Sequence, residues 1–158
     1  MISVSRLFAF DAAHRVLGHA GKCRHLHGHR WQVEVALAPS LLAPDLDTLG
    51  MVLDFAEIKA RIGAWIEETF DHNILLHTSD PLAKLWQRGE RADLGNGLTV
   101  ADLFGSGKQP CLLDCNPTAE NLAQLIHVRS RVLLHGLPVA VQQVRVWETP
   151  NCAATHVA

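Results

Sequence analysis

The segment from His29 to Leu37 alternates between apolar and polar side chains, and this alternation restricts the fold more than any other feature of the chain. Trp31, Val33, Val35 and Leu37 occupy every second position, with polar side chains opposite them between residues 30 and 34. Successive side chains of a strand point to opposite faces, so the pattern predicts a strand with one buried and one solvated face. A strand of this kind belongs in an antiparallel sheet that is covered on one side.

The rest of the chain supplies partners for this strand. Three more segments have strand-like patterns: residues 2–10, 49–53 and 139–147. Apolar residues with helical spacing follow Asp54, a good N-cap residue, and follow the pair Pro117-Thr118. A shorter helix is predicted over residues 81–88. Together these segments predict an α+β fold, in which two helices cover one face of a small antiparallel sheet.

Size and composition favour one globular domain and argue against binding to nucleic acid or insertion into a membrane. The 158 residues fit a single domain spanning residues 1–158, in which a Gly-rich segment at about 78–115 is predicted to be an insertion. The net charge is −2, and the chain has neither a Lys/Arg cluster typical of nucleic-acid binding nor an apolar run long enough for a membrane span. Four cysteines without a CxxC pair or an export signal predict reduced thiols in the cytoplasm.

The most specific local motif is His27-Gly28-His29 at the start of the alternating segment. In an extended chain the two rings point to the same side and can bind one ion. His14, at the end of the first predicted strand, is the best candidate for a third ligand. Three histidines leave one coordination position open, as in catalytic zinc sites. Taken alone, the motif is more typical of two surface histidines than of a metal site.

Three further residues form a candidate group for proton transfer. Cys23 precedes His27 by four residues, and a nearby cation would favour its thiolate form. Asp71 is followed directly by His72, and an adjacent carboxylate often orients an imidazole ring. The alternatives are a small apolar role for Cys23 and a helix-end role for the Asp71-His72 pair.

These residues occur within six motifs that, in this order, resemble the 6-pyruvoyl-tetrahydropterin synthase family, which includes the bacterial 6-carboxy-tetrahydropterin synthases of queuosine biosynthesis. Each motif is weak alone, but the six together span nearly the whole chain. The motifs are Phe10-Asp11-Ala12-Ala13-His14, Cys23-Arg24-His25-Leu26-His27-Gly28-His29, Leu53-Asp54-Phe55, Phe70-Asp71-His72-Asn73, Asn116-Pro117-Thr118-Ala119-Glu120-Asn121 and Val146-Trp147-Glu148-Thr149-Pro150.

The resemblance implies a role for each matching residue. It implies a zinc ion held by His14, His27 and His29, and a catalytic group made of Cys23, Asp71 and His72. Two residues are implied to bind the pterin substrate: Glu148, whose alternative role is that of a solvated residue at a strand end, and Thr118, which is equally suited to capping a helix.

The resemblance also implies an architecture and an activity. The family adopts the tunnelling fold, with a four-stranded antiparallel sheet and two helices on one face, and assembles into homo-oligomers, commonly hexamers, with sites between subunits. The implied reaction converts 7,8-dihydroneopterin triphosphate to 6-carboxytetrahydropterin, acetaldehyde and triphosphate. The alternatives are elimination of triphosphate alone to give the 6-pyruvoyl product, an aldolase-like reaction on dihydroneopterin, and a non-catalytic protein that binds a pterin or a metal.

Overall fold

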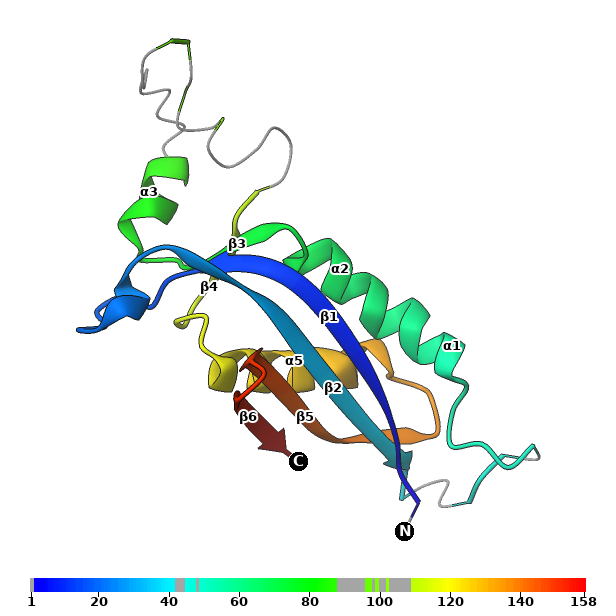
Figure 1. Cartoon of the computed structure of the whole chain (residues 1–158). Coiled ribbons are helices and arrows are strands. Elements are labelled where there is room, and N and C mark those ends of the chain that lie inside the picture. The colour runs from blue at the N-terminus through cyan, green and yellow to red at the C-terminus, as the bar shows by residue number, and fades with distance from the viewer. Residues whose placement is uncertain are drawn as a thin grey trace. The chain divides into compact units, whose positions relative to one another are not determined.

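Six strands form one hydrogen-bonded sheet in the order β4-β3-β1-β2-β5-β6 (Figure 1). The computed structural model describes residues 2–41, 45–47, 49–87, 96–97, 99, 102 and 109–158. The strands are β1 (Val4–His14), β2 (His27–Pro39), β3 (Asn73–His77), β4 (Cys111–Leu113), β5 (Val139–Thr149) and β6 (Cys152–Val157). The helical segments are η1 (Lys22–Arg24), α1 (Phe55–Ile58), η2 (Lys59–Gly63), α2 (Ala64–Phe70), α3 (Pro81–Gln87) and α5 (Ala119–Leu133).

The chain divides into two compact units. The first contains residues 1–10, 30–68 and 119–158, and the second contains residues 11–29 and 69–118. Strands β1 and β2 contribute to both units because each continues across the division. The α+β class expected from the sequence is confirmed.

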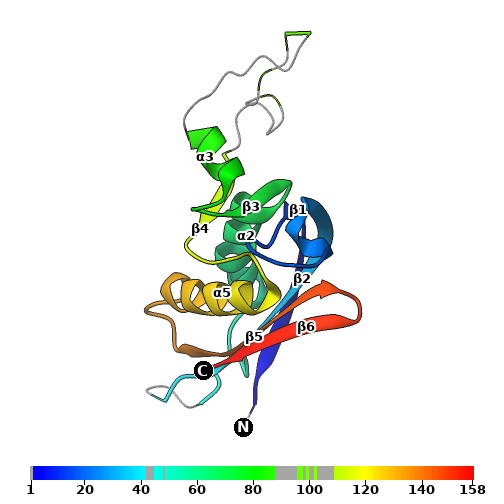
Figure 2. The ribbon, with the colours of Figure 1, turned by 90° about the vertical axis from the view of Figure 1, so that its left-hand side faces the viewer.

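The first unit contains the apolar core that the alternation in β2 predicts. The β2 residues Trp31, Val33, Val35 and Leu37 are fully buried, and β2 pairs antiparallel with β5. The run α1-η2-α2 and the helix α5 both lie on the same face of these strands (Figures 1 and 2). The helices bury Ile58, Ile62, Ile66, Leu122 and Ile126. This face is therefore dry because both helices contribute a stripe of aliphatic side chains.

The second unit contains the ends of β1 and β2 together with two strands that run parallel to β1. Ala12 pairs with Asn73 and His14 with Leu75, and β4 extends the sheet beyond β3. The fully buried Asp80 caps α3, because its Oδ1 accepts a hydrogen bond of 2.9 Å from the Leu82 N–H. Its Oδ2 lies 3.0 Å from Nε of Arg15. This ion pair connects the residue after β1 to the beginning of α3.

The prediction of a four-stranded antiparallel sheet was wrong in detail. The sheet has six strands, and β3 pairs in parallel with both β1 and β4. The strand predicted at 49–53 is instead a turn. The Asp47 carboxylate accepts hydrogen bonds of 2.8 Å from the N–H groups of Leu49 and Met51. Gly50 adopts a φ of 82°, which favours glycine. The Asp47 carboxylate thus satisfies backbone N–H groups that, in a strand, would donate to a neighbouring strand.

The helices begin close to the predicted positions. Asp54 caps α1 by accepting a hydrogen bond of 2.7 Å from the Ala56 N–H. The short helix predicted over 81–88 is present as α3, and Arg88 lies outside the described residues. Two apolar residues of these helices are exposed, Phe55 by 49% and Val132 by 58%. Phe55 is the first residue of α1, and Val132 is the second-last residue of α5.

Part of the predicted insertion at about 78–115 lies outside the described residues, and its role and the single-domain organisation stay predictions. Within it, the structure shows α3 and β4, of which β4 belongs to the sheet. No helix in the described part of the chain has the length and apolarity needed to cross a membrane.

The buried Arg15–Asp80 pair gives a prediction for stability. Asp80→Ala leaves the Arg15 guanidinium without its buried partner and removes the cap of α3, so we expect a loss of about 3 kcal/mol or more in unfolding free energy. Urea unfolding measures this loss. Glu57→Ala is the control, because it removes an exposed pair with Arg61 (2.8 Å) and should cost less than about 1 kcal/mol. Equal losses in the two variants would contradict a stabilising role for the buried pair.

A second prediction concerns His127 on α5, which is 3% exposed and whose Nε2–H donates to the Val141 carbonyl at 3.3 Å. Burial, and secondarily the charges of His156 and Arg131, lower the pKa of His127 below 6.5, against the raising effect of this hydrogen bond. The unfolded chain therefore takes up a proton before the native protein does. The unfolding free energy should fall as pH decreases below about 6.5, and should level off below the lowered native pKa.

Urea unfolding at several pH values between 7.5 and 5 tests this prediction. His127→Asn should show a smaller decrease in stability on acidification than the wild type. His135→Asn removes an exposed histidine from the neighbouring turn and should behave as the wild type does. Parallel pH profiles for the wild type and His127→Asn would contradict the prediction.

Candidate metal and catalytic site

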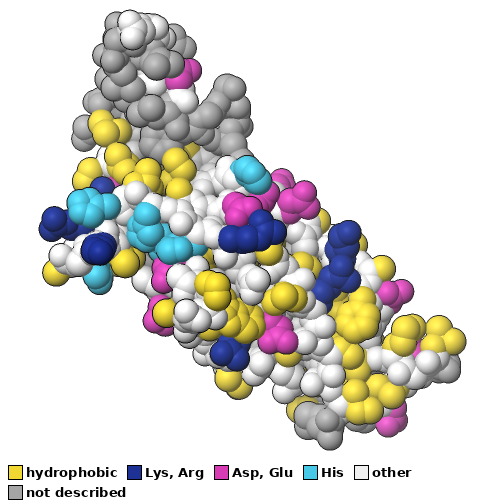
Figure 3. Space-filling model, viewed as in Figure 1, with side chains coloured by type: hydrophobic (Ala, Val, Ile, Leu, Met, Phe, Trp, Pro, Cys, Tyr) yellow, Lys and Arg dark blue, Asp and Glu magenta, His cyan; other side chains and the backbone are white. Residues whose placement is uncertain are grey.

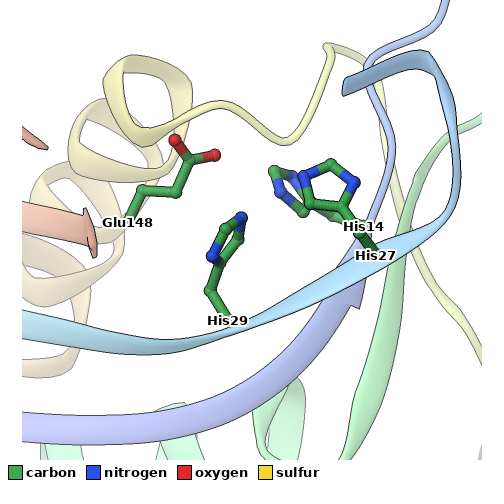
Figure 4. Close-up of side chains that lie close together, drawn as sticks. All are labelled: His14, His27, His29 and Glu148. Carbon is green, nitrogen blue, oxygen red and sulfur yellow. The ribbon is translucent and has the colours of Figure 1, made fainter. Parts of the chain in front are cut away.

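Three histidines converge at the ends of β1 and β2. His27 and His29 follow the same alternation as the buried residues of β2, and His14 is the last residue of β1. The ring centroids are 4.5 Å apart for His14 and His27, 5.3 Å for His14 and His29, and 5.0 Å for His27 and His29. Figure 4 shows the three rings directed toward one another. Their ligand nitrogens lie within 4.8 Å of one another, a separation that small rotations can close onto one ion.

Two backbone carbonyls fix the orientation of these rings. Nδ1 of His14 lies 2.7 Å from the Pro117 carbonyl oxygen, and Nδ1 of His27 lies 2.7 Å from the His25 carbonyl oxygen. A carbonyl only accepts, so each Nδ1 carries the proton and each Nε2 carries the lone pair. This is the arrangement that outer hydrogen bonds give to metal-binding histidines. Neutral imidazoles that share one focus suit a divalent zinc ion, so the residues present fit the metal.

The loop before α5 holds the ligand-bearing segment in place. The Asn116 side chain accepts a hydrogen bond from the Leu17 N–H (2.8 Å) and donates to the Leu17 carbonyl (3.0 Å). The Val16 N–H donates to the Cys23 carbonyl at 2.8 Å. The sequence did not predict this role for Asn116 or for the Pro117 carbonyl. The motif around Asn116 could have indicated a functional residue. Its hydrogen bonds to Leu17, however, join residues about 100 positions apart and could not be predicted from the sequence.

Asp71 and His72 form a hydrogen-bonded pair immediately before β3. Nδ1–H of His72 donates to Oδ2 of Asp71 at 2.6 Å, and Oδ1 of Asp71 accepts from the Asp11 N–H at 2.9 Å. The His72 N–H donates to the Asp11 carbonyl at 2.7 Å. His72 has a φ of 51°, a backbone conformation that residues other than glycine rarely adopt. Such conformations cluster at functional sites. The side chain of His72 is 79% exposed, so its ring is held from one side and open to solvent.

Cys23 lies at the centre of η1, on the loop that joins β1 to β2. Its side chain is partly exposed, and within the described residues no hydrogen bond connects it to Asp71 or His72. The structure therefore brings together two members of the predicted catalytic group and leaves the third on a separate loop. Burial, and then the charge of Asp114, raise the pKa of the Cys115 thiol and so lower its thiolate fraction.

The two residues predicted to bind substrate occupy irregular positions. Glu148 lies on β5 between Trp147 and Thr149, where the pairing of β5 with β6 shifts its register. A bulge of this kind re-aims a side chain, and bulges are frequent beside active sites. Thr118 directly precedes α5, and its N–H donates to the Asn116 carbonyl at 2.8 Å. Glu148, labelled in Figure 4, belongs to the first compact unit, and its role stays a prediction.

Comparisons with known proteins agree with the motifs. Residues 3–158 match the family model described as 6-pyruvoyl tetrahydropterin synthase. A 6-carboxy-5,6,7,8-tetrahydropterin synthase of Rickettsia bellii is 36% identical over 155 residues, which cover 96% of this chain and 97% of that protein. The enzyme of the same name from Rickettsia felis is 37% identical over 155 residues, with the same coverage of 96% and 97%.

Solved structures show the same fold. An uncharacterized protein from Wolinella succinogenes has a TM-score of 0.74 at 24% identity, covering 99% of this chain and 97% of that one. The 6-pyruvoyl tetrahydropterin synthase of Caenorhabditis elegans has a TM-score of 0.63 at 21% identity, covering 99% and 95%. The chain therefore belongs to the 6-pyruvoyl tetrahydropterin synthase family and has its tunnelling fold.

The convergence of the rings predicts how the chain will bind zinc. His27→Ala removes a ring already oriented by the His25 carbonyl. Because outer hydrogen bonds of zinc ligands are alone worth about 10–100-fold in affinity, loss of the ring should cost more than about 100-fold. Competition with a chromogenic chelator measures the affinity. Gly28→Ala is the control, because a Cβ there would lie 3.4 Å from the Ala12 carbonyl oxygen, an ordinary contact. If the His27→Ala variant bound zinc with the affinity of the wild type, His27 would not be a zinc ligand.

Proposed function

We propose that this protein is a zinc-dependent 6-carboxy-5,6,7,8-tetrahydropterin synthase. The observation that carries the proposal is the convergence of His14, His27 and His29, with two of the rings oriented by backbone carbonyls. The names of the Rickettsia relatives, which match nearly the full chain, support the proposed product. The reaction would convert 7,8-dihydroneopterin triphosphate and one water molecule to 6-carboxytetrahydropterin, acetaldehyde and triphosphate, in the biosynthesis of queuosine.

The three imidazoles would hold the metal through nitrogen donors. Zinc bound there would act as a Lewis acid that polarises and acidifies hydroxyl groups of the substrate side chain. The carbonyls of Pro117 and His25 keep the rings of His14 and His27 in one tautomer and one orientation. The substrate would then meet a metal centre whose geometry is set before binding.

Proton transfer would fall to the Asp71-His72 pair and Cys23. Asp71 accepts a hydrogen bond from Nδ1–H of His72, so Nε2 would be the nitrogen that exchanges protons with the substrate. The Asp71 carboxylate stabilises the imidazolium that forms when His72 accepts a proton. Cys23 would act as the second acid/base group at the substrate side chain. Its position on the loop directly before His27 supports this role.

Substrate recognition and assembly complete the proposal. Glu148 would accept two hydrogen bonds from the amino-pyrimidinone edge of the pterin, as a carboxylate does from a guanidinium group. Thr118 would contact the same ring near the start of α5. We also propose a homo-oligomer, a hexamer by family resemblance, with active sites between subunits. The cytoplasmic location expected from the sequence stays a prediction.

Product analysis tests the proposed reaction. The zinc-loaded protein, incubated with 7,8-dihydroneopterin triphosphate, should release acetaldehyde and triphosphate together with a product that has the mass of 6-carboxytetrahydropterin. Mass spectrometry identifies the pterin, and an alcohol dehydrogenase assay measures the acetaldehyde. Triphosphate release with a 6-pyruvoyl product and no acetaldehyde would overturn the choice between the two synthases.

The same assay separates an enzyme from a binding protein. Cys23→Ala should retain zinc and pterin binding but lose turnover by about 100-fold or more, the usual contribution of a positioned acid/base group. Cys152→Ala is the matched control, because Cys152 is exposed on β6 and has no proposed role. Binding of the pterin without turnover in the zinc-loaded wild type would favour a non-catalytic protein.

A further inference from the structure

Residues 12–29 form a basic segment around the metal centre. This stretch contains Arg15, Lys22 and Arg24 together with five histidines, and it contains no Asp or Glu although the chain has 16 acidic residues and a net charge of −2. Figure 3 shows Lys/Arg and His side chains gathered over the loop that carries η1. The segment therefore has a positive charge that the chain as a whole lacks, and a local field of this kind attracts anions.

Two of the three permanent charges in this segment are directed to solvent. Arg15 is neutralised by the buried carboxylate of Asp80. Lys22 and Arg24 are both exposed, and in the part of the chain that the structure describes no acidic side chain pairs with either. Nε of Arg24 lies 3.3 Å from Nε2 of His25, which holds the guanidinium on the loop. These two cations are thus available for an anionic ligand.

The loop is coupled to the candidate metal ligands through its backbone. Lys22 and Arg24 flank Cys23 in a single helical turn, which the Arg24 N–H closes by donating to the Gly21 carbonyl at 3.3 Å. His25 directly follows η1, and its carbonyl accepts a hydrogen bond from Nδ1 of His27 at 2.7 Å. Consecutive Cα atoms are about 3.8 Å apart, so the Cα atom of Arg24 lies within about 11 Å of that of His27. A ligand at the metal centre that extends over η1 would meet both cations.

We propose that Lys22 and Arg24 bind the triphosphate group of the substrate. This inference rests on the proposed function and specifies which residues distinguish the phosphorylated substrate from its dephosphorylated form. The triphosphate is the part of that substrate with high negative charge, and Arg and Lys are the residues best suited to phosphate oxygens. Binding at η1 would place the substrate side chain beside Cys23, which lies between the two cations.

The test compares two double variants that remove the same amount of charge. Lys22→Gln/Arg24→Gln removes the proposed triphosphate contacts and keeps Cys23. Lys59→Gln/Lys84→Gln removes two exposed lysines from other elements and serves as the control. For the first variant, we expect KM for 7,8-dihydroneopterin triphosphate and Ki for inorganic triphosphate to rise about tenfold or more. The Ki of 7,8-dihydroneopterin, which lacks phosphate, should stay within about twofold, and the zinc content should not change.

Each outcome decides the proposal. Unchanged KM and triphosphate Ki in Lys22→Gln/Arg24→Gln would overturn it. So would an equal loss of affinity for 7,8-dihydroneopterin, because the variant would then have disturbed the whole site, and so would an equal effect in the control variant.

Failure of the proposed function has a different signature. If the wild type does not turn over the triphosphate substrate, calorimetry with inorganic triphosphate and zinc-loaded protein replaces the kinetic comparison, with zinc content measured before and after. Binding that is weaker in Lys22→Gln/Arg24→Gln than in the control supports an anion site at η1, and equal or absent binding overturns it.

Discussion

The metal centre depends on the alternation of side chains along β1 and β2. The face of β2 that buries Trp31 and Val33 is the face on which His27 and His29 lie, and His14 ends β1 in the same unit as these two rings. The strands thus change from apolar residues to imidazoles without a change of backbone geometry. Because successive residues alternate strictly, a one-residue slip of either strand would turn its histidines to the other face.

The second unit is organised around contacts that hold this arrangement. Asn116 brackets the backbone of Leu17, the Pro117 carbonyl orients His14, and Asp11 bonds through its backbone to both Asp71 and His72. Every one of these contacts uses a backbone group on at least one side. The geometry therefore depends on where the loops lie, and it tolerates changes of side chain at the backbone positions. The Arg15–Asp80 pair adds a charged contact between the end of β1 and α3.

The sequence predicted the strands and helices that have long periodic patterns. It did not predict the short strands, or the turn that replaces the strand expected at 49–53. Strands β1, β2 and β5 and the helices after Asp54 and Pro117 were recognised from their periodicity. Strand β3 (Asn73–His77) has only a short apolar run, which periodicity cannot assign, and most of β6 (Cys152–Val157) is exposed. The error at 49–53 arose because Asp47 bonds the local backbone, an effect that an apolar pattern does not reveal.

The sequence alone determined the chemistry of the site: imidazoles at 14, 27 and 29, a carboxylate beside an imidazole at 71 and 72, and a strand pattern that puts His27 and His29 on one side. Only the tertiary structure decided that His14 joins them, that carbonyls of Pro117 and His25 select the tautomers, and that no hydrogen bond within the described residues joins Cys23 to His72. The physical reason is that residue type and alternation are local properties. The meeting of residues about 100 positions apart depends on strand pairing and loop contacts, which form only when the chain folds.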